Sequence, residues 1–216
     1  MSRRILWDWN GTLLDDTQAA LDTLNFMILE RGGRPIGMDF YRSRFAFPVR
    51  PFYDEIGIIA HDEREWDGIA REYHDVYASR PKRLNRETVA ALERAKEAGA
   101  SQFIISALRQ DLLESDVARY GLSGYFEALY GTDNLDGGSK LSRARELLAR
   151  LSGEGATPKD IVVIGDALHD KEVADALGVR CVLCGQGSHS AERLARVAPT
   201  GETLSESLSL ALSLPL

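Results

Sequence analysis

The sequence predicts an α/β protein with a doubly wound parallel sheet and an inserted block of helices. From residue 83 onward, short apolar runs alternate with helix-forming stretches, a pattern typical of a parallel sheet covered by helices on both faces. Residues 17–82 carry helical patterns but no run with clear strand alternation. Acidic and hydroxyl residues follow several of the apolar runs, at the sheet edge where such folds bind ligands.

The chain opens with a short apolar strand that ends at an acid. Ile5, Leu6 and Trp7 form the strand, and Asp8 stands at its carboxyl end. The next residues, Trp9-Asn10-Gly11-Thr12, predict a turn that exposes backbone amides. The opening stretch therefore places a carboxylate beside a turn able to bind an anion.

A helix is predicted over residues 17–30, with apolar side chains at helical spacing. Asp15 or Asp16 is expected to cap it, and Gly32-Gly33 ends it. The following residues stay helical but polar, a longer helix is predicted over 62–79, and Pro81 closes the segment. We therefore predict a helical cap domain at 17–82, inserted into a core domain formed by 1–16 and 83–216.

The core resumes after the cap with regular alternation of helix and strand. Helices are predicted at 86–97, 110–119, 141–151 and 171–177, and strands at 102–106, 126–130, 161–164 and 179–183. The Leu/Ser-rich tail has leucines at helical spacing and no basic residue on its polar face. We expect it to form a last helix packed on the core rather than a membrane-surface helix.

Composition narrows the possible functions. The 216 residues carry 26 Lys and Arg against 33 Asp and Glu, a formal charge of −7, which argues against nucleic-acid or anionic-membrane binding. No run reaches the length of a membrane span, and the charged opening does not resemble a signal peptide. A cytoplasmic protein, monomer or homodimer, is expected.

The two cysteines, Cys181 and Cys184, form an isolated Cys-x-x-Cys inside a predicted strand. A zinc site needs further ligands, and a redox pair would stand at the start of a helix. On a strand, residues three apart point to opposite faces. We therefore expect two separate core residues.

Five polar residues lie at the ends of different predicted strands or in the loops beyond them: Asp8, Ser106, Lys140, Asp166 and Asp170. The carboxyl ends of parallel strands meet at one edge, so distant segments can build one site there. A carboxylate nucleophile, oxygen ligands for a hard cation, a hydroxyl and a lysine suit phosphoryl transfer. The sequence thus predicts a phosphate and metal site.

The same residues resemble, in order, the four motifs of the haloacid dehalogenase-like hydrolases, in the phosphoglycolate phosphatase-like or β-phosphoglucomutase-like branch. DWNGT resembles the first motif, FIIS the second, GGSKL the third and GDALHD the fourth. The resemblance implies a Mg²⁺-dependent phosphatase that forms an aspartyl-phosphate on a small phosphate ester. It implies the catalytic residues Asp8, Asn10, Ser106 and Lys140.

The resemblance also implies ligands for the ion and the substrate. Mg²⁺ would be held by Asp8, Asp166, Asp170 and the backbone carbonyl of Asn10. The expected substrate-binding residues are Trp9, Gly11, Thr12, Ala107 and Arg50. The cap stretch FAFPVRPFY, with Arg44 and Arg50 at or beside it, would reach an anionic substrate when the cap closes.

Asn10 departs from the family pattern, which has a second Asp at this position. That Asp protonates the leaving group and then activates water, a role worth about 10²–10⁴ in rate. An amide cannot perform it. We therefore predict weak phosphatase activity, better on aryl than on alkyl phosphates, with His169 as one substitute proton donor.

Two alternatives stay open. A catalytically silent member would keep phosphate and metal binding without turnover. DWNGT is also similar to the DWAGT of phosphonoacetaldehyde hydrolases, which would require a Schiff-base lysine, for which Lys82 at the cap boundary is the candidate.

Overall fold

A computed structural model describes residues 2–132 and 140–215. Its centre is a six-stranded sheet in the order β5-β4-β1-β6-β7-β8, with every neighbouring pair parallel. The strands are β1 (Arg4–Trp7), β4 (Ser101–Arg109), β5 (Ala128–Thr132), β6 (Ile161–Gly165), β7 (Arg180–Cys184) and β8 (Thr200–Gly201). The predicted doubly wound parallel sheet is confirmed.

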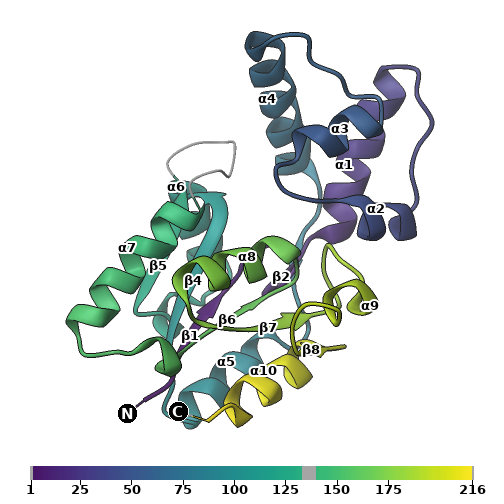
Figure 1. Cartoon of the computed structure of the whole chain (residues 1–216). Helices are drawn as coiled ribbons and strands as arrows, with labels where there is room; N and C mark the ends of the chain where they lie inside the picture. Colours follow the sequence, from purple (N-terminus) through teal and green to yellow (C-terminus); the bar gives the residue numbers. More distant parts are fainter. Residues whose placement is uncertain (1, 133–139, 216) are drawn as a thin grey trace.

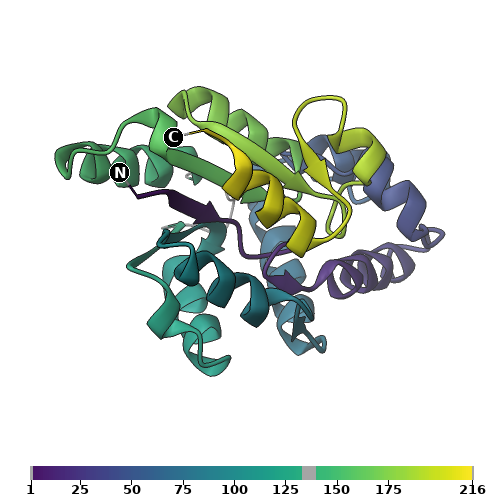
Figure 2. The same cartoon turned by 90° about the horizontal axis from the view of Figure 1, so that it is seen from below.

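Helices cover both faces of this sheet (Figures 1 and 2). One face packs against α5 (Thr88–Glu97), α6 (Gln110–Arg119) and α10 (Leu204–Ser213). The other packs against α7 (Lys140–Gly153), α8 (Leu168–Leu177) and α9 (Ala191–Leu194). In β1, Ile5 and Trp7 enter the first core and Leu6 the second, which explains why the strand is apolar at every position.

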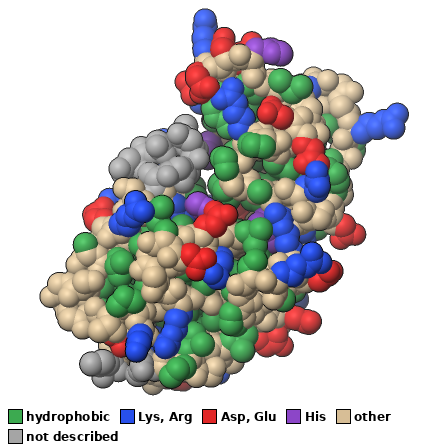
Figure 3. All heavy atoms as spheres, in the orientation of Figure 1, with side chains coloured by type: hydrophobic (Ala, Val, Ile, Leu, Met, Phe, Trp, Pro, Cys, Tyr) green, Lys and Arg blue, Asp and Glu red, His purple; other side chains and the backbone are tan. Residues whose placement is uncertain are grey.

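Helices α1 (Thr17–Glu30), α2 (Met38–Arg44), α3 (Arg50–Glu55) and α4 (Glu63–Ser79) form a separate group beside the sheet (Figure 1). They enclose a hydrophobic cluster of their own, with Leu24, Met27 and Ile58 almost fully buried. A two-stranded antiparallel ribbon, β2 (Leu14–Asp15) with β3 (Arg83–Leu84), joins this group to the sheet. In surface view the group forms its own lobe (Figure 3).

Most predicted elements appear with shifted ends. Strand β4 continues to Arg109 rather than stopping at residue 106, and α8 begins at Leu168 rather than 171. The ribbon β2–β3, strand β8 and helix α9 were not predicted, because elements of two to four residues carry too little periodicity. The tail helix α10 packs on the core through fully buried leucines, as predicted.

The cysteines are both buried and unpaired, on opposite faces of β7. Cys181 belongs to one core and Cys184 to the other. Burial raises the pKa of both thiols, to about 11 for Cys184. The interpretation of two separate core residues is therefore confirmed. Within the described ranges, none of the helices is both long and apolar enough to cross a membrane.

Candidate active site

Two acids stand side by side because the strands before them are neighbours. Trp7 and Ile164 are register partners in β1 and β6, and the Asp8 N–H donates to the Ile164 carbonyl over 2.8 Å. Asp166 follows β6 through Gly165, where a Cβ would collide with the side chain of Asp170 at 2.2 Å. The glycine therefore allows the fourth-motif acids to approach the strand end.

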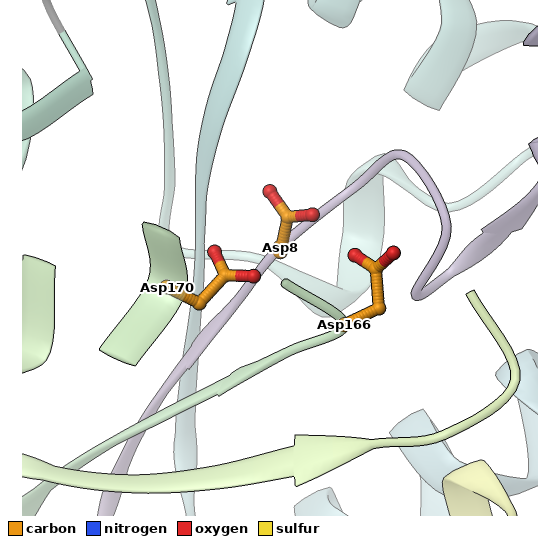
Figure 4. Close-up of side chains that lie close together, drawn as sticks. All are labelled: Asp8, Asp166 and Asp170. Carbon is orange, nitrogen blue, oxygen red and sulfur yellow. The ribbon is translucent and has the colours of Figure 1, made fainter. Parts of the chain in front are cut away.

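Asp8, Asp166 and Asp170 form a cluster at this edge of the sheet (Figure 4). One ligand oxygen from each lies within 4.8 Å of those of the other two. All three residues are buried, with at most 7% of Asp8 exposed. Two hydrogen bonds hold the group in place: the Thr12 hydroxyl donates to Asp166, and the Ala167 N–H donates to Asp170.

Lys140, the first residue of α7, lies between two of these acids. Its Nζ is 2.6 Å from Asp8 Oδ1 and 2.6 Å from Asp170 Oδ1, and its side chain is buried. Burial alone would lower the lysine pKa, but the carboxylates of Asp170 and Asp8 raise it above its ordinary value. Lys140 is therefore a permanent cation beside Asp8.

One lysine does not balance three carboxylates. Burial raises the pKa of Asp8 well above its usual range, although Lys140 opposes this shift. Burial and the neighbouring Asp170 raise the pKa of Asp166 to about 6. The cluster has an excess of two negative charges when ionised, and its oxygen donors are those that hard divalent cations prefer. The residues present fit a divalent metal ion.

Gly11 and Gly187 leave the space that Asp166 occupies. A Cβ on Gly11 would lie 2.2 Å from Asp166 Oδ2, and one on Gly187 would lie 2.1 Å from it. Gly11 also adopts φ +74°, which L side chains rarely adopt. The Ser188 N–H donates to Asp166 Oδ2 over 2.5 Å. These backbone segments hold the carboxylate against Asp8.

A cavity of about 190 Å³ is lined by the acidic cluster and by residues of α1, α2, α3 and α4. Of the predicted site residues, Asp8, Asn10, Ser106, Ala107, Lys140, Asp166 and Asp170 line it. Ser106 ends the apolar part of β4, and its Oγ accepts a 3.0 Å hydrogen bond from the Leu108 N–H. Its own hydroxyl hydrogen remains able to serve as a donor.

Four predicted substrate-binding residues do not line the cavity: Trp9, Gly11, Thr12 and Arg50. The Gly11 N–H donates to Asp16 over 2.7 Å, and the Thr12 hydroxyl donates to Asp166 over 3.2 Å. The Trp9 indole is fully buried in the core. Its backbone amide stays a predicted phosphate donor, and the Gly11 and Thr12 donors bond to carboxylates in this structure.

Arg50, which is predicted to reach a substrate when the cap closes, contacts residues of α4 in this structure. Its Nη1 lies 2.6 Å from Glu63 Oε1, and its guanidinium lies over the Trp66 ring at 5.4 Å. Arg44 pairs with Glu55 in the same way. Each arginine thus forms an ion pair with a glutamate from the same group of helices, Arg44 with Glu55 and Arg50 with Glu63.

Asp16 is a site residue that the sequence interpretation missed. It was expected as a possible helix cap, but its side chain makes no capping bond. Instead Oδ1 accepts from the Gly11 N–H, and Oδ2 accepts from the Asn10 amide at 2.7 Å and from the Tyr77 hydroxyl. Burial raises its pKa, and these donors partly oppose the shift. Asn10 therefore supplies a donor that an ionised acid at this position could not supply.

Two other candidates lie in different surroundings. His169 lines the cavity, where its ring packs against Phe47 with centroids 5.0 Å apart. Lys82 does not line the cavity: its Nζ donates to the Tyr77 carbonyl over 2.7 Å. The lysine that a Schiff-base mechanism needs is thus turned toward the backbone of α4.

The loop after β7 ties the cap to the core. His189 accepts from the Leu168 N–H at Nδ1 and lies 2.7 Å from the Phe45 carbonyl at Nε2. Arg42 of α2 donates to the carbonyls of Gln186 and Gly187. These contacts join the fourth motif to the cap. The sequence did contain a signal for this loop. It follows the carboxyl end of the predicted strand 179–183, and the other site segments also follow the carboxyl ends of strands.

Comparison with known proteins identifies relatives over most of the chain. A phosphoglycolate phosphatase of Pseudomonas aeruginosa is 25% identical over 207 residues, covering 93% of this chain and 75% of its own. A 5'-nucleotidase of the same organism is 26% identical over 203 residues, covering 91% and 88%.

Solved structures share the fold. The crystal structure of a predicted phosphatase from Clostridium acetobutylicum superimposes with a TM-score of 0.81 at 18% identity, covering 99% of this chain and all of that one. The family model for haloacid dehalogenase-like hydrolases matches residues 5–184, from the first strand to the end of β7. The predicted resemblance is confirmed, and the chain belongs to the haloacid dehalogenase-like hydrolases.

Proposed function

We propose that the protein is a Mg²⁺-dependent phosphatase that hydrolyses small phosphate monoesters through an aspartyl-phosphate on Asp8. The observation that carries this proposal is the position of Asp8. Its carboxylate lies in a cavity, 2.6 Å from a permanently charged lysine and within one cluster with Asp166 and Asp170. The relatives named phosphatases support the same chemistry.

In this mechanism an Asp8 oxygen attacks phosphorus, the phosphorus–oxygen bond to the leaving group breaks, and water later attacks the aspartyl-phosphate. Lys140 neutralises Asp8 and the phosphoryl oxygens, and the Ser106 hydroxyl donates to them. Asp8, Asp166, Asp170 and the Asn10 carbonyl would hold Mg²⁺. The ion would supply positive charge to the phosphoryl group.

Proton transfer is the weak step of the proposed reaction. Asn10 cannot give a proton to the leaving oxygen, and its Nδ2 donates to Asp16 and Tyr77. An aryl oxide leaves without protonation more readily than an alkoxide. The expected activity is therefore higher on aryl phosphates, as the sequence predicts.

The residues 17–82 would act as the cap that selects the substrate, and 1–16 with 83–216 as the catalytic core. The proposed partner is a small phosphate ester, and the proposed location is the cytoplasm. The cap contributes much of the cavity wall beyond the acidic cluster. Substrate choice would thus depend on cap side chains.

The test is hydrolysis of 4-nitrophenyl phosphate with and without Mg²⁺, with Asp8→Asn as the matched control. We expect turnover that requires the ion and is lost in Asp8→Asn. Borohydride reduction during turnover should convert Asp8 to homoserine, which mass spectrometry of the peptide detects. Binding of Mg²⁺ and phosphate without any turnover would favour the silent member instead.

A further inference from the structure

We infer that the cap half of the cavity recognises an uncharged aromatic group, so that the preferred esters are phosphates of aromatic alcohols without a second acidic group. The inference rests on the proposed function for the phosphate end of the cavity. It concerns recognition, and is separate from the acidity of the leaving group.

Aromatic side chains dominate the cavity wall opposite the acidic cluster. Seven of them come from residues 17–82: Tyr41, Phe45, Phe47, Tyr53, Trp66, Tyr73 and Tyr77. They support each other, since the rings of Tyr73 and Tyr77 stack 5.7 Å apart and Tyr53 meets Trp66 edge to face at 5.5 Å. Such a wall offers both ring faces and ring edges to an aromatic group.

The cavity volume is of the size that holds one aromatic ring. A dry protein cavity of about 150 Å³ is known to hold benzene, and this cavity has about 190 Å³. Burial raises the pKa of Tyr53 and Tyr73 above the ordinary range, so their phenols stay neutral. The wall therefore presents apolar surface and neutral hydroxyls, together with the carboxylate of Asp16 and two imidazoles.

A substrate carboxylate would find no fixed positive charge in this half. Among the described residues that line the cavity, Lys140 is the only lysine or arginine, and Asp8 and Asp170 hold it. The segment 133–139 contains no basic residue. Two histidines, His74 and His169, also line the cavity.

The arginines of α2 and α3 cannot supply this charge without breaking other bonds. Arg44 and Arg50 pair with Glu55 and Glu63, and Arg42 donates to the core loop. A second anionic group on the substrate would be buried without a partner, which costs more than burying a neutral ring gains. The wall thus discriminates against small diacids such as phosphoglycolate.

The test uses phosphonates that cannot be hydrolysed, so that recognition is measured apart from turnover. Isothermal titration with Mg²⁺ compares benzylphosphonate, propylphosphonate and 4-carboxybenzylphosphonate. We expect benzylphosphonate to bind about tenfold more tightly than propylphosphonate. We expect 4-carboxybenzylphosphonate to bind at least about tenfold more weakly than benzylphosphonate. Equal affinities, no binding, or preference for the carboxylated ring would overturn the inference.

A charge placed in the wall provides the matched test. Ala70 lines the cavity from α4. Ala70→Lys should restore tight binding of 4-carboxybenzylphosphonate, whereas Ala70→Leu, which adds apolar bulk without charge, should not. Failure of the lysine variant to favour the carboxylated ring over the leucine variant would also count against the inference. If the aromatic preference holds but phenyl phosphate and 4-nitrophenyl phosphate are not hydrolysed by the parent, the proposed function fails and the recognition stands.

Discussion

Replacing Asn10 by aspartate restores the family pattern and should destabilise this protein. The Asn10 amide nitrogen lies 2.7 Å from Asp16 Oδ2 and 3.0 Å from the Tyr77 hydroxyl. Asp16 is buried and already accepts from the Gly11 N–H and Tyr77. In Asn10→Asp, a carboxylate oxygen would take the place of the donor.

The magnitude follows from that separation. Two unit charges 2.7 Å apart repel by about 6 kcal/mol at an effective dielectric constant near 20. Protonating one carboxyl removes the repulsion, and for an ordinary carboxyl this costs about 4 kcal/mol at pH 7 and about 1.5 kcal/mol at pH 5. The folded protein takes the cheaper route, so we expect a loss of about 4 kcal/mol at pH 7.

The direction of the pH effect follows from linkage. The shared proton raises a carboxyl pKa in the folded state of the variant, so the folded state binds more protons than the unfolded state above about pH 4. The destabilisation is therefore small near pH 4 and grows as pH rises. Urea unfolding of parent and variant at pH 5 and pH 7, in EDTA, measures it.

The matched control exchanges the two side chains. Asn10→Asp with Asp16→Asn keeps one carboxylate and one amide in contact, and its free energy of unfolding should lie within about 1 kcal/mol of the parent. Its carboxylate then stands where the family has the acid, so hydrolysis of alkyl phosphates should rise by about 10². If Asn10→Asp were as stable as the parent at pH 7, the assigned repulsion would be refuted.

Three further predictions concern the charged groups. Lys140→Met leaves Asp8 and Asp170 buried without their cation; we expect about 3–5 kcal/mol less stability in EDTA by urea unfolding, most of it regained with Mg²⁺. Mg²⁺ should raise the melting temperature of the parent but not of Asp166→Asn, and its affinity should fall below about pH 6, where Asp166 becomes protonated; an equal shift in both proteins would contradict the assigned cluster. Burial, with Arg193 adding to it, lowers the His189 pKa to about 4. The contribution of neutral His189 to the free energy of unfolding is therefore complete above pH 6.5 and is lost as pH falls toward 4. The parent should lose up to about 3 kcal/mol there relative to His189→Gln, and parallel pH profiles would contradict this assignment.

The sequence carried the information for the sheet because each core strand is short, apolar and followed by a helix. Ile5, Leu6 and Trp7 fill two cores at once, and only a strand covered on both faces needs three consecutive apolar residues. The rule that strand ends meet at one edge then brought Asp8 and Asp166 together. Lys140 lies beside Asp8 although 132 residues separate them.

Side-chain partners outside the strands could not be predicted in this way. Arg50 stands in an aromatic turn that looked ready for an anion, yet Glu63 lies within 2.6 Å of it. Asp16 looked like a helix cap, but the approach of Tyr77 from α4 makes it the acceptor of a buried network. Such pairings depend on how the cap helices pack, which no local pattern encodes.

Residues 4–16 illustrate what the order of residues determines and what only contacts in the folded chain determine. The sequence by itself determined the family, the strand before Asp8 and the missing second acid at Asn10, because these depend on residue type and order along the chain. Only the tertiary structure decided that Asn10 faces Asp16 and that the described part of the cavity wall is rich in aromatic residues and contains no arginine. Contacts between distant side chains decide these features, since each buried donor and charge must find its partner in space.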